Sequence, residues 1–177
     1  MRIVAGKLRH RIIDMTNLDT TRETQDKVRG AIYNMIGPYF DGGSCLDLFA
    51  GSGAMGIEAF SRGVDKFTLN DLNKEAINVC KRNCESLKIM DSVKLSNLDY
   101  KDFCKNSLDK YSLIILDPPY RMDNIEEILE AVYPLLDSEG IIVYEMGIDS
   151  LYPFKFHDLE LWKNKEYGIK RVVVYRR

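Results

Sequence analysis

The chain has 177 residues, which is the size of one ordinary domain, and 45% of them are apolar, enough to form a packed core. Its formal net charge of −2 argues against indiscriminate binding to nucleic acid. No stretch reaches the roughly 20 apolar residues of a membrane-spanning helix, and the N-terminus lacks the long apolar segment of a secretory signal. We therefore expect a protein of the cytoplasm.

The first predicted element is an N-terminal β-hairpin, because two short β-type runs, residues 2–5 and 8–13, flank Gly6-Lys7. This segment is a local positive patch, since four basic residues precede the first acidic one. These residues are Arg2, Lys7, Arg9 and Arg11. Such a patch is typical of a nucleic-acid contact, but a solvated edge hairpin explains it equally well. We expect residues 1–20 to be an appendage to one domain, residues 21–177.

The rest of the chain alternates helical patterns with short apolar runs. The first predicted helix covers residues 22–36 and ends at Gly37-Pro38. The predicted strands are then 45–49, 66–69, 93–95, 113–116 and 141–144, and the predicted helices are 54–61, 74–87, a short one near residue 101, and 125–136. Two β-rich runs within residues 162–176 flank Tyr167-Gly168 and predict a closing hairpin. This order predicts an α/β fold with a mostly parallel, seven-stranded sheet and helices on both faces.

A glycine-rich turn follows the strand at residues 45–49. Residues 51–56 have the sequence GSGAMG, the spacing of a dinucleotide-binding turn, and Asp71 follows at about the distance of a ribose-binding acid. Asp47, however, lies in the strand just before the turn. A carboxylate there opposes a pyrophosphate, which needs positive potential, but suits the cationic ammonium of S-adenosylmethionine. Charge therefore favours S-adenosylmethionine over NAD.

The motif Asp117-Pro118-Pro119-Tyr120 directly follows an apolar strand, at the edge where open α/β sheets place their ligands. An exocyclic base nitrogen is a poor nucleophile, because its lone pair is delocalised into the ring. Two acceptors, the Asp117 carboxylate and the Pro118 carbonyl, would hold its N–H groups and direct the lone pair at a methyl donor. Tyr120 would stack on the base. The motif therefore predicts methyl transfer to an exocyclic amine without a metal, and the alternative is an ordinary turn.

Residues 46–53, with the sequence LDLFAGSG, closely resemble motif I of the class I methyltransferases, whose fold is Rossmann-like. The resemblance implies that the backbone of residues 51–53 packs against the donor, that Asp71 binds both ribose hydroxyls and that Asp99 accepts from the adenine amino group. Taken singly, the two acids are also ordinary residues at loop starts. The residues that the resemblance assigns to cofactor binding are Thr24, Asp47, Phe49, Gly51, Ser52, Gly53, Asp71, Leu72, Asp99 and Tyr100.

Nearly the whole chain resembles the bacterial family of small-subunit (16S) rRNA guanine-N2 methyltransferases, the RsmD type. The opening residues 2–9 and the closing Tyr167-Gly168 hairpin fit this family. Glu23 and Gly30 depart from its signature helix, where a proline and a glutamate are usual. The residues that match the signature are Arg22, Thr24, Asp26, Val28, Arg29, Tyr33 and Asn34.

The family resemblance implies a monomeric enzyme that methylates guanine N2 of 16S rRNA in the assembling small ribosomal subunit. Its catalytic residues would be Asp117, Pro118 and Tyr120. It would use S-adenosylmethionine, release S-adenosylhomocysteine and need no metal. The implied RNA contacts are Arg2, Lys7, Arg9, His10, Arg11, Arg22 and Arg29. Solvated surface arginines remain an alternative for two of them, Arg22 and Arg29.

Three other functions stay open, because the Asp-Pro-Pro-Tyr motif identifies the kind of nitrogen and not the base. A DNA or RNA adenine-N6 methyltransferase shares the motif, although the chain has no room for the target-recognition insert of the DNA enzymes. A non-catalytic module that binds S-adenosylmethionine or RNA is less favoured, because the motif is intact. An NAD-dependent reductase is disfavoured by Asp47. The four cysteines form no C-x-x-C pair and lie far from both histidines, so we expect no zinc site.

Overall fold

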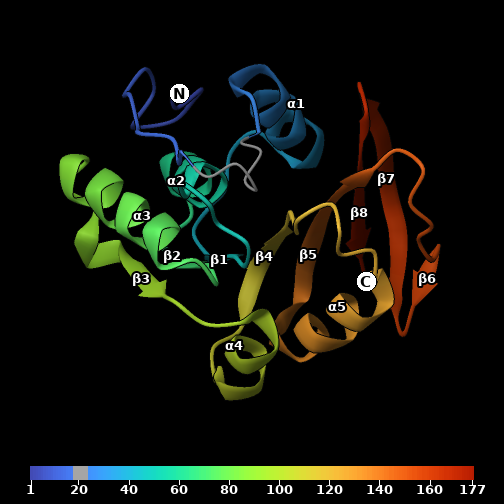
Figure 1. The fold of residues 1–177 in the computed structure, drawn as a ribbon. Helices are drawn as coiled ribbons and strands as arrows, with labels where there is room; N and C mark the ends of the chain where they lie inside the picture. The colour runs from blue at the N-terminus through green and yellow to red at the C-terminus, as the bar shows by residue number, and fades with distance from the viewer. Residues whose placement is uncertain (18–23) are drawn as a thin grey trace.

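The computed structural model describes residues 1–17 and 24–177, which form one mixed sheet with helices on both faces (Figure 1). Along the sheet the strands follow the order β3-β2-β1-β4-β5-β8-β7-β6. The strands are β1 (Ser44–Asp47), β2 (Lys66–Asn70), β3 (Val93–Ser96), β4 (Tyr111–Leu116), β5 (Leu136–Gly147), β6 (Lys155–Phe156), β7 (Leu159–Tyr167) and β8 (Lys170–Arg176). The helices are α1 (Asp26–Ile36), α2 (Ala54–Ser61), α3 (Lys74–Ser86), α4 (Tyr100–Asn106) and α5 (Ile125–Val132), with 3₁₀ turns at Met90–Ser92 and Tyr133–Leu135.

The sheet confirms the predicted α/β fold and differs from the prediction in its strand count. β1 to β5 pair in parallel with their neighbours. β8 pairs antiparallel with β5, β7 with β8, and β6 with β7, so β7 and β8 form the predicted closing hairpin. The described residues contain eight strands rather than seven, because β6 adds two residues at the edge. Two residues are too few to show an alternating pattern in the sequence.

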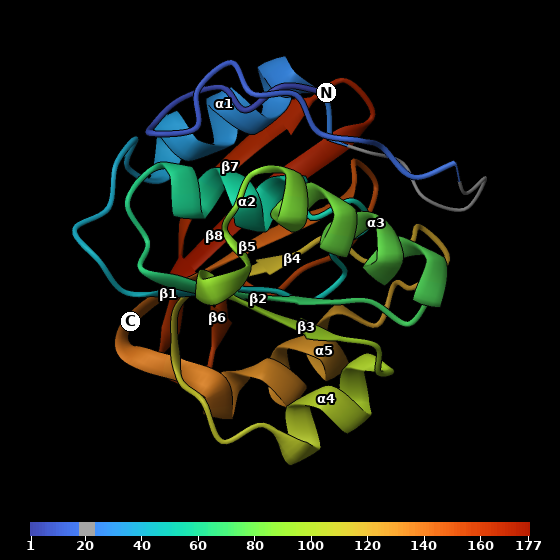
Figure 2. The same ribbon diagram turned by 90° about the vertical axis from the view of Figure 1, so that its left-hand side faces the viewer.

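Apolar side chains bury both faces of the sheet. The helices α1, α2 and α3 cover one face, and α4 and α5 cover the other (Figure 2). Side chains alternate between the faces along each strand, so in β4 Leu113 and Ile115 join the first apolar cluster while Ile114 and Leu116 join the second. This double burial explains why the strands appear in the sequence as continuous apolar runs.

In the N-terminal segment, residues 1–17, the two arms of the predicted β-hairpin pair antiparallel only at their outer ends and form no extended strands. Its ladder is one isolated bridge between Arg2 and Ile12. The N–H groups of Val4 and Ala5 donate to the carboxylate of Glu58 in α2, at 2.9 and 3.1 Å. These donors are therefore not available to a second strand. The apolar residues of the segment instead anchor it in the core. The buried ones are Ile3, Leu8 and Ile13.

Two helices differ from their predicted bounds. α1 begins at Asp26 rather than at residue 22, because Gln25 before it is extended, with φ −61° and ψ 151°; residues 22 and 23 of the prediction lie outside the described residues. The helix predicted for 125–136 ends at Val132, since Pro134 introduces a 3₁₀ turn and β5 starts directly after it. Within residues 1–17 and 24–177, no helix is both long and apolar enough to span a membrane.

Candidate active site

A cavity of about 360 Å³ lies where the parallel strands β1, β2, β4 and β5 end. The strand order reverses at this point, because the chain runs from β1 outward to β3 on one side and through β4 to β5 on the other. A reversal of this kind leaves a crevice at the carboxyl ends of the strands, which is where open α/β sheets bind ligands. The volume is within the range of about 300–1,000 Å³ for small-molecule sites. The cavity is therefore the candidate active site.

The glycine-rich turn forms one wall of the cavity and seats α2. Gly51 lines the wall, and Gly53 caps α2 with φ +87°. A Cβ on Gly53 would lie 2.8 Å from Cδ1 of Leu69, so only glycine fits there. Ser52 is fully buried, and its carbonyl accepts from Nδ2 of Asn83 at 3.0 Å. Ser52 and Gly53 shape the turn and are not among the residues that line the cavity, so their assignment to cofactor binding stays a prediction.

Three acids that follow successive strands meet in the cavity, as the sequence predicts. Asp47 is almost fully buried, and its Oδ2 accepts from the N–H of Gly56 at 3.0 Å. Asp71 accepts from the N–H of Gly51 at 2.9 Å, and Asp99 accepts from a backbone N–H at the start of α4. Each acid therefore also holds local backbone, as the alternative interpretation expects. A carboxylate has about four acceptor positions, so each retains capacity for a ligand.

Aromatic side chains form a second wall, beside the start of α4. The rings of Phe49 and Tyr100 lie 5.7 Å apart at 47°, and both line the cavity. Leu72, at the mouth, is 68% exposed. Tyr144 also lines this cavity, and its hydroxyl is buried without a hydrogen-bond partner among the described residues. An apolar slot with an unpaired hydroxyl and nearby acids fits the adenosine part of S-adenosylmethionine.

The Asp-Pro-Pro-Tyr loop closes the cavity from above the end of β4. All four residues of the loop line it. The Asp117 side chain is 20% exposed and faces the interior, whereas Tyr120 is 48% exposed at the mouth. The N–H of Met122 donates to the carbonyl of Pro119 at 2.9 Å, which turns the chain toward α5. The predicted catalytic residues Asp117, Pro118 and Tyr120 thus share one cavity with the predicted cofactor residues.

Glu145 and Lys170 complete the site and were not predicted. Lys170 Nζ lies 3.7 Å from Oδ2 of Asp117 and 3.8 Å from Oε1 of Glu145. The Thr24 hydroxyl donates to Oε1 of Glu145 at 3.1 Å, so Thr24 lines the cavity as expected. Burial and the nearby Asp117 charge raise the pKa of Glu145 to about 8, which Lys170 opposes. The sequence signal for Glu145 is a single charge inside the apolar run of β5.

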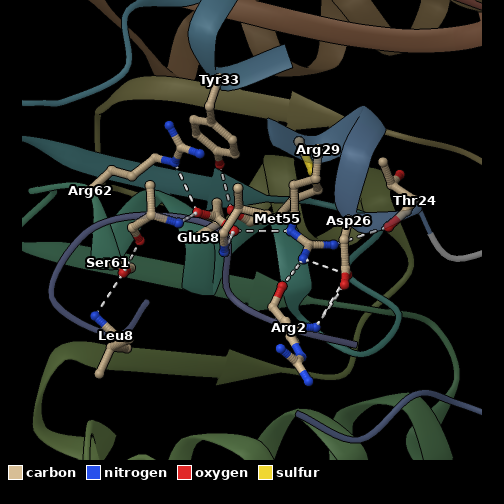
Figure 3. A network of polar contacts seen from close by, with 12 residues as sticks. Arg2, Leu8, Thr24, Asp26, Arg29, Tyr33, Met55, Glu58, Ser61 and Arg62 are labelled. Carbon is tan, nitrogen blue, oxygen red and sulfur yellow. Dashed lines mark hydrogen bonds and ion pairs between the residues drawn. The ribbon is translucent and has the colours of Figure 1, made fainter. Parts of the chain in front are cut away.

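Arg29 was predicted to contact RNA, and that prediction is wrong (Figure 3). Its side chain is fully buried beneath α1. The guanidinium pairs with Glu58 at 3.1 Å and with Asp26 at 2.9 Å, and it donates to the carbonyl of Thr24 at 3.1 Å. Glu58 also pairs with Arg62 at 2.9 Å. A buried charge needs such partners, and these leave the guanidinium of Arg29 no path to a surface ligand.

The remaining predicted RNA contacts are on the surface and stay predictions. The basic residues of the N-terminal segment are exposed: Arg2, Lys7, Arg9, His10 and Arg11. Lys7 Nζ lies 3.7 Å from the Phe60 ring centroid, and an Arg11 nitrogen donates to the carbonyl of Ser86 at 3.3 Å. Arg22 lies outside the described residues. Across the part of the chain that the structure describes, no three His, Cys, Asp or Glu side chains are grouped to hold a metal ion.

Known proteins resemble this chain over its full length. The YlbH protein of Bacillus subtilis is 35% identical over 182 residues, which cover 100% of this chain and 99% of YlbH. The Ribosomal RNA small subunit methyltransferase D of Escherichia coli K12 is 27% identical over 179 residues, covering 100% of this chain and 90% of its own length. Among solved structures, a conserved hypothetical protein of Streptococcus pyogenes has a TM-score of 0.82 and 39% identity, covering 85% of this chain and 95% of its own.

The match to a protein family agrees with the geometry of the cavity. The family model described as Conserved hypothetical protein 95 matches residues 1–176. Its match includes the glycine-rich turn, the three acids and the Asp-Pro-Pro-Tyr loop. The chain therefore belongs to the family of Conserved hypothetical protein 95, and it is a methyltransferase, as its resemblance to the RsmD type implied.

Proposed function

We propose that this protein transfers a methyl group from S-adenosylmethionine to the exocyclic N2 of a guanine in small-subunit (16S) rRNA. One observation carries the proposal: a single cavity is lined both by the three acids of the methyltransferase pattern and by the Asp-Pro-Pro-Tyr loop. Relatives at full length are named Ribosomal RNA small subunit methyltransferase D, which supports rRNA as the substrate. The choice of guanine N2 follows from the resemblance to the RsmD type.

The residues present fit the methyl donor. Asp71 would bind the ribose hydroxyls, Asp99 would accept from the adenine amino group, and the Phe49 and Tyr100 rings would pack against the base. Asp47 would face the ammonium of the donor's methionine portion, because a carboxylate there attracts positive charge. When bound, S-adenosylmethionine supplies a methyl group on a sulfonium, which is already an activated leaving group.

The loop residues would handle the target base. Asp117 and the Pro118 carbonyl accept one N–H each from the exocyclic amine, hold the nitrogen and push it toward tetrahedral geometry. Such positioning lowers a barrier by several kcal/mol. Asp117 then receives the proton that the amine loses, a role that contributes on the order of 10²–10⁴ in rate. Tyr120 is half exposed at the mouth, where it can stack on a base that has left its helix.

The N-terminal segment is the proposed RNA-docking surface. Its exposed basic side chains can neutralise phosphates without reading sequence. Hydrogen bonds connect the segment to the cavity. The N–H of Arg2 donates to Asp26, and Arg29 donates both to Asp26 and to the carbonyl of Thr24, a residue that lines the cavity. We further propose that the protein acts as a monomer in the cytoplasm, on RNA of the assembling small subunit.

Methyl transfer to small-subunit rRNA from cells that lack the gene tests the function. We expect the purified protein and labelled S-adenosylmethionine to form N2-methylguanine, identified by mass mapping of the digested RNA. Calorimetry should show binding of S-adenosylhomocysteine and none of NAD. If the product is N6-methyladenine, the target base is adenine and not guanine. Binding of NAD without binding of S-adenosylhomocysteine would contradict the methyl donor itself.

A further inference from the structure

Lys170 occupies a position between the two acids at the ends of β4 and β5. It is the first residue of β8, directly after the Gly168-Ile169 turn, so the closing hairpin places its side chain at the cavity. Its Nζ lies 3.7 Å from Asp117 and 3.8 Å from Glu145, and its side chain is 16% exposed. These distances make Lys170 a shared counter-charge for two carboxylates on neighbouring strands.

The charges around Lys170 keep it protonated. Burial alone would lower its pKa, but Asp117 and Glu145 outweigh burial, and the pKa of Lys170 is raised. On the other side, the Glu145 carboxyl accepts a hydrogen bond from the Thr24 hydroxyl, so its position is fixed from the segment just before α1. The other titratable groups that face this cluster are Tyr144 of β5, Tyr120 of the loop, Tyr167 of β7 and Asp47 of β1. The cluster therefore contains one ammonium for three carboxyl groups.

We propose that Lys170 is a positioning residue for methyl transfer, whose ammonium keeps the Asp117 carboxylate ionised and directed into the cavity. This inference rests on the proposed function. Methyl transfer to an amine forms a nitrogen–carbon bond, breaks the sulfur–carbon bond of the donor and releases one proton from the nitrogen. Asp117 can accept that N–H and then the proton only as a carboxylate. Without Lys170, Asp117 would have to ionise beside Glu145 with no cation between them.

The test compares Lys170→Met, Lys170→Arg and a control, Lys165→Met, on the same hairpin. Lys165 is exposed, its Nζ lies 5.5 Å from the Tyr167 ring, and among the described residues it forms no ion pair with either acid. We expect Lys170→Met to move the acid limb of the pH profile of kcat up by about one pH unit or more. At a given pH on that limb, a shift of one pH unit lowers kcat about tenfold. Lys170→Arg keeps the cation, so its acid limb should stay at the wild-type pH. The affinity for S-adenosylmethionine should not fall in Lys170→Met, because the removed charge repels a cationic donor.

A second measurement does not depend on activity. Carbon-13 NMR titration of the Asp and Glu carboxyl groups in the donor-free protein should show the Asp117 resonance titrating at higher pH in Lys170→Met than in the wild type. An unchanged acid limb and an unchanged titration in Lys170→Met would overturn the inference, as would identical profiles for the Met and Arg variants. If the wild type does not methylate RNA, the proposed function fails, whereas the titration still decides whether Lys170 controls Asp117.

Discussion

At the scale of single residues, the structure separates side chains that build the cavity from those that face the substrate. Asp47, Asp71 and Asp99 each accept a backbone N–H, so each holds a turn or a helix start in addition to any ligand. No local sequence pattern distinguishes these two uses of an acid. Asp117 instead pairs with Lys170 at 3.7 Å, and the two prolines after it remove backbone donors from its loop. Its substitution should therefore affect chemistry more than folding.

Replacement of Asp117 by alanine should abolish most turnover and leave donor binding nearly intact. We expect a loss on the order of 10²–10⁴ in single-turnover methyl transfer to small-subunit rRNA, because the amine loses both its anchor and its proton acceptor. Asp117→Asn should be milder, since its side-chain carbonyl still accepts one hydrogen bond. Asp91→Ala, on the exposed 3₁₀ turn before β3, is the matched control. Near-normal turnover by Asp117→Ala would place the active site elsewhere.

At the scale of elements, Glu58 of α2 joins three parts of the chain (Figure 3). Its carboxylate is fully buried, pairs with Arg29 and Arg62, and accepts from the backbone of the N-terminal segment. Neutralising it removes the counter-charge of the buried Arg62 and leaves the buried Arg29 paired with Asp26 alone. We expect Glu58→Gln to lower the free energy of unfolding by about 3–5 kcal/mol in denaturant titrations, and to speed hydrogen exchange at Val4 and Ala5.

The control for this prediction is Glu85→Gln. Glu85 pairs with Lys81 at 3.9 Å on the exposed face of α3, and both side chains are more than half exposed. Exposed pairs contribute about 0–1 kcal/mol, so this variant should unfold almost like the wild type. Equal stability of the Glu58 and Glu85 variants would show that the buried network does not hold the N-terminal segment in place.

The N-terminal segment itself yields a prediction for RNA binding. Replacing Arg9 and Arg11 together by alanine should weaken RNA binding and reduce the slope of log K against log salt by about two units, because two phosphate contacts are lost. Donor binding should not change, since neither residue lines the cavity. Measurements of RNA affinity between low and moderate salt test this. A wild-type affinity and slope would make the patch an ordinary solvated surface.

The elements also show what the sequence could and could not predict. The parallel strands and the carboxyl-edge site were predictable, because apolar runs, glycine turns and strand-end acids are local patterns. The hairpin prediction overestimated the length of the two strands, because alternating apolar residues look the same in a strand and in a loop anchored by Ile3 and Ile13. The role of Arg29 depends on Glu58, 29 residues away, and Lys170 meets Asp117 only after the sheet has formed. No local pattern contains such pairings.

At the scale of the whole molecule, the site works against the stability of the fold. The sheet brings Asp117 and Glu145 together around one lysine, with Asp47 near Glu145. Because burial disfavours a charge, Glu145 holds its proton in the folded protein at pH values where an unfolded chain has lost it. The folded protein can relieve this cost by binding a cation. A positively charged donor should therefore stabilise the protein more at high pH than at low pH.

Glu145→Gln isolates this effect in the ligand-free protein. The pKa of Glu145 is raised from 4.5 to about 8, so between these pH values the folded state binds more protons than the unfolded state. The stability of the wild type should then fall as pH rises through this window, by at most about 1.4 kcal/mol per pH unit from this group. Glutamine cannot ionise, so the variant lacks that loss.

The free energy of unfolding of Glu145→Gln should therefore exceed that of the wild type by an amount that grows from about pH 5 and levels off above about pH 8. Urea titrations at a series of pH values measure the difference. Glu139→Gln, an exposed position on the same strand, controls for the general effect of removing one acid. A difference that does not change with pH would mean that Glu145 ionises as readily in the folded protein as in the unfolded chain. The charge cluster would then not lower the free energy of unfolding, and donor binding would have no such loss of stability to offset.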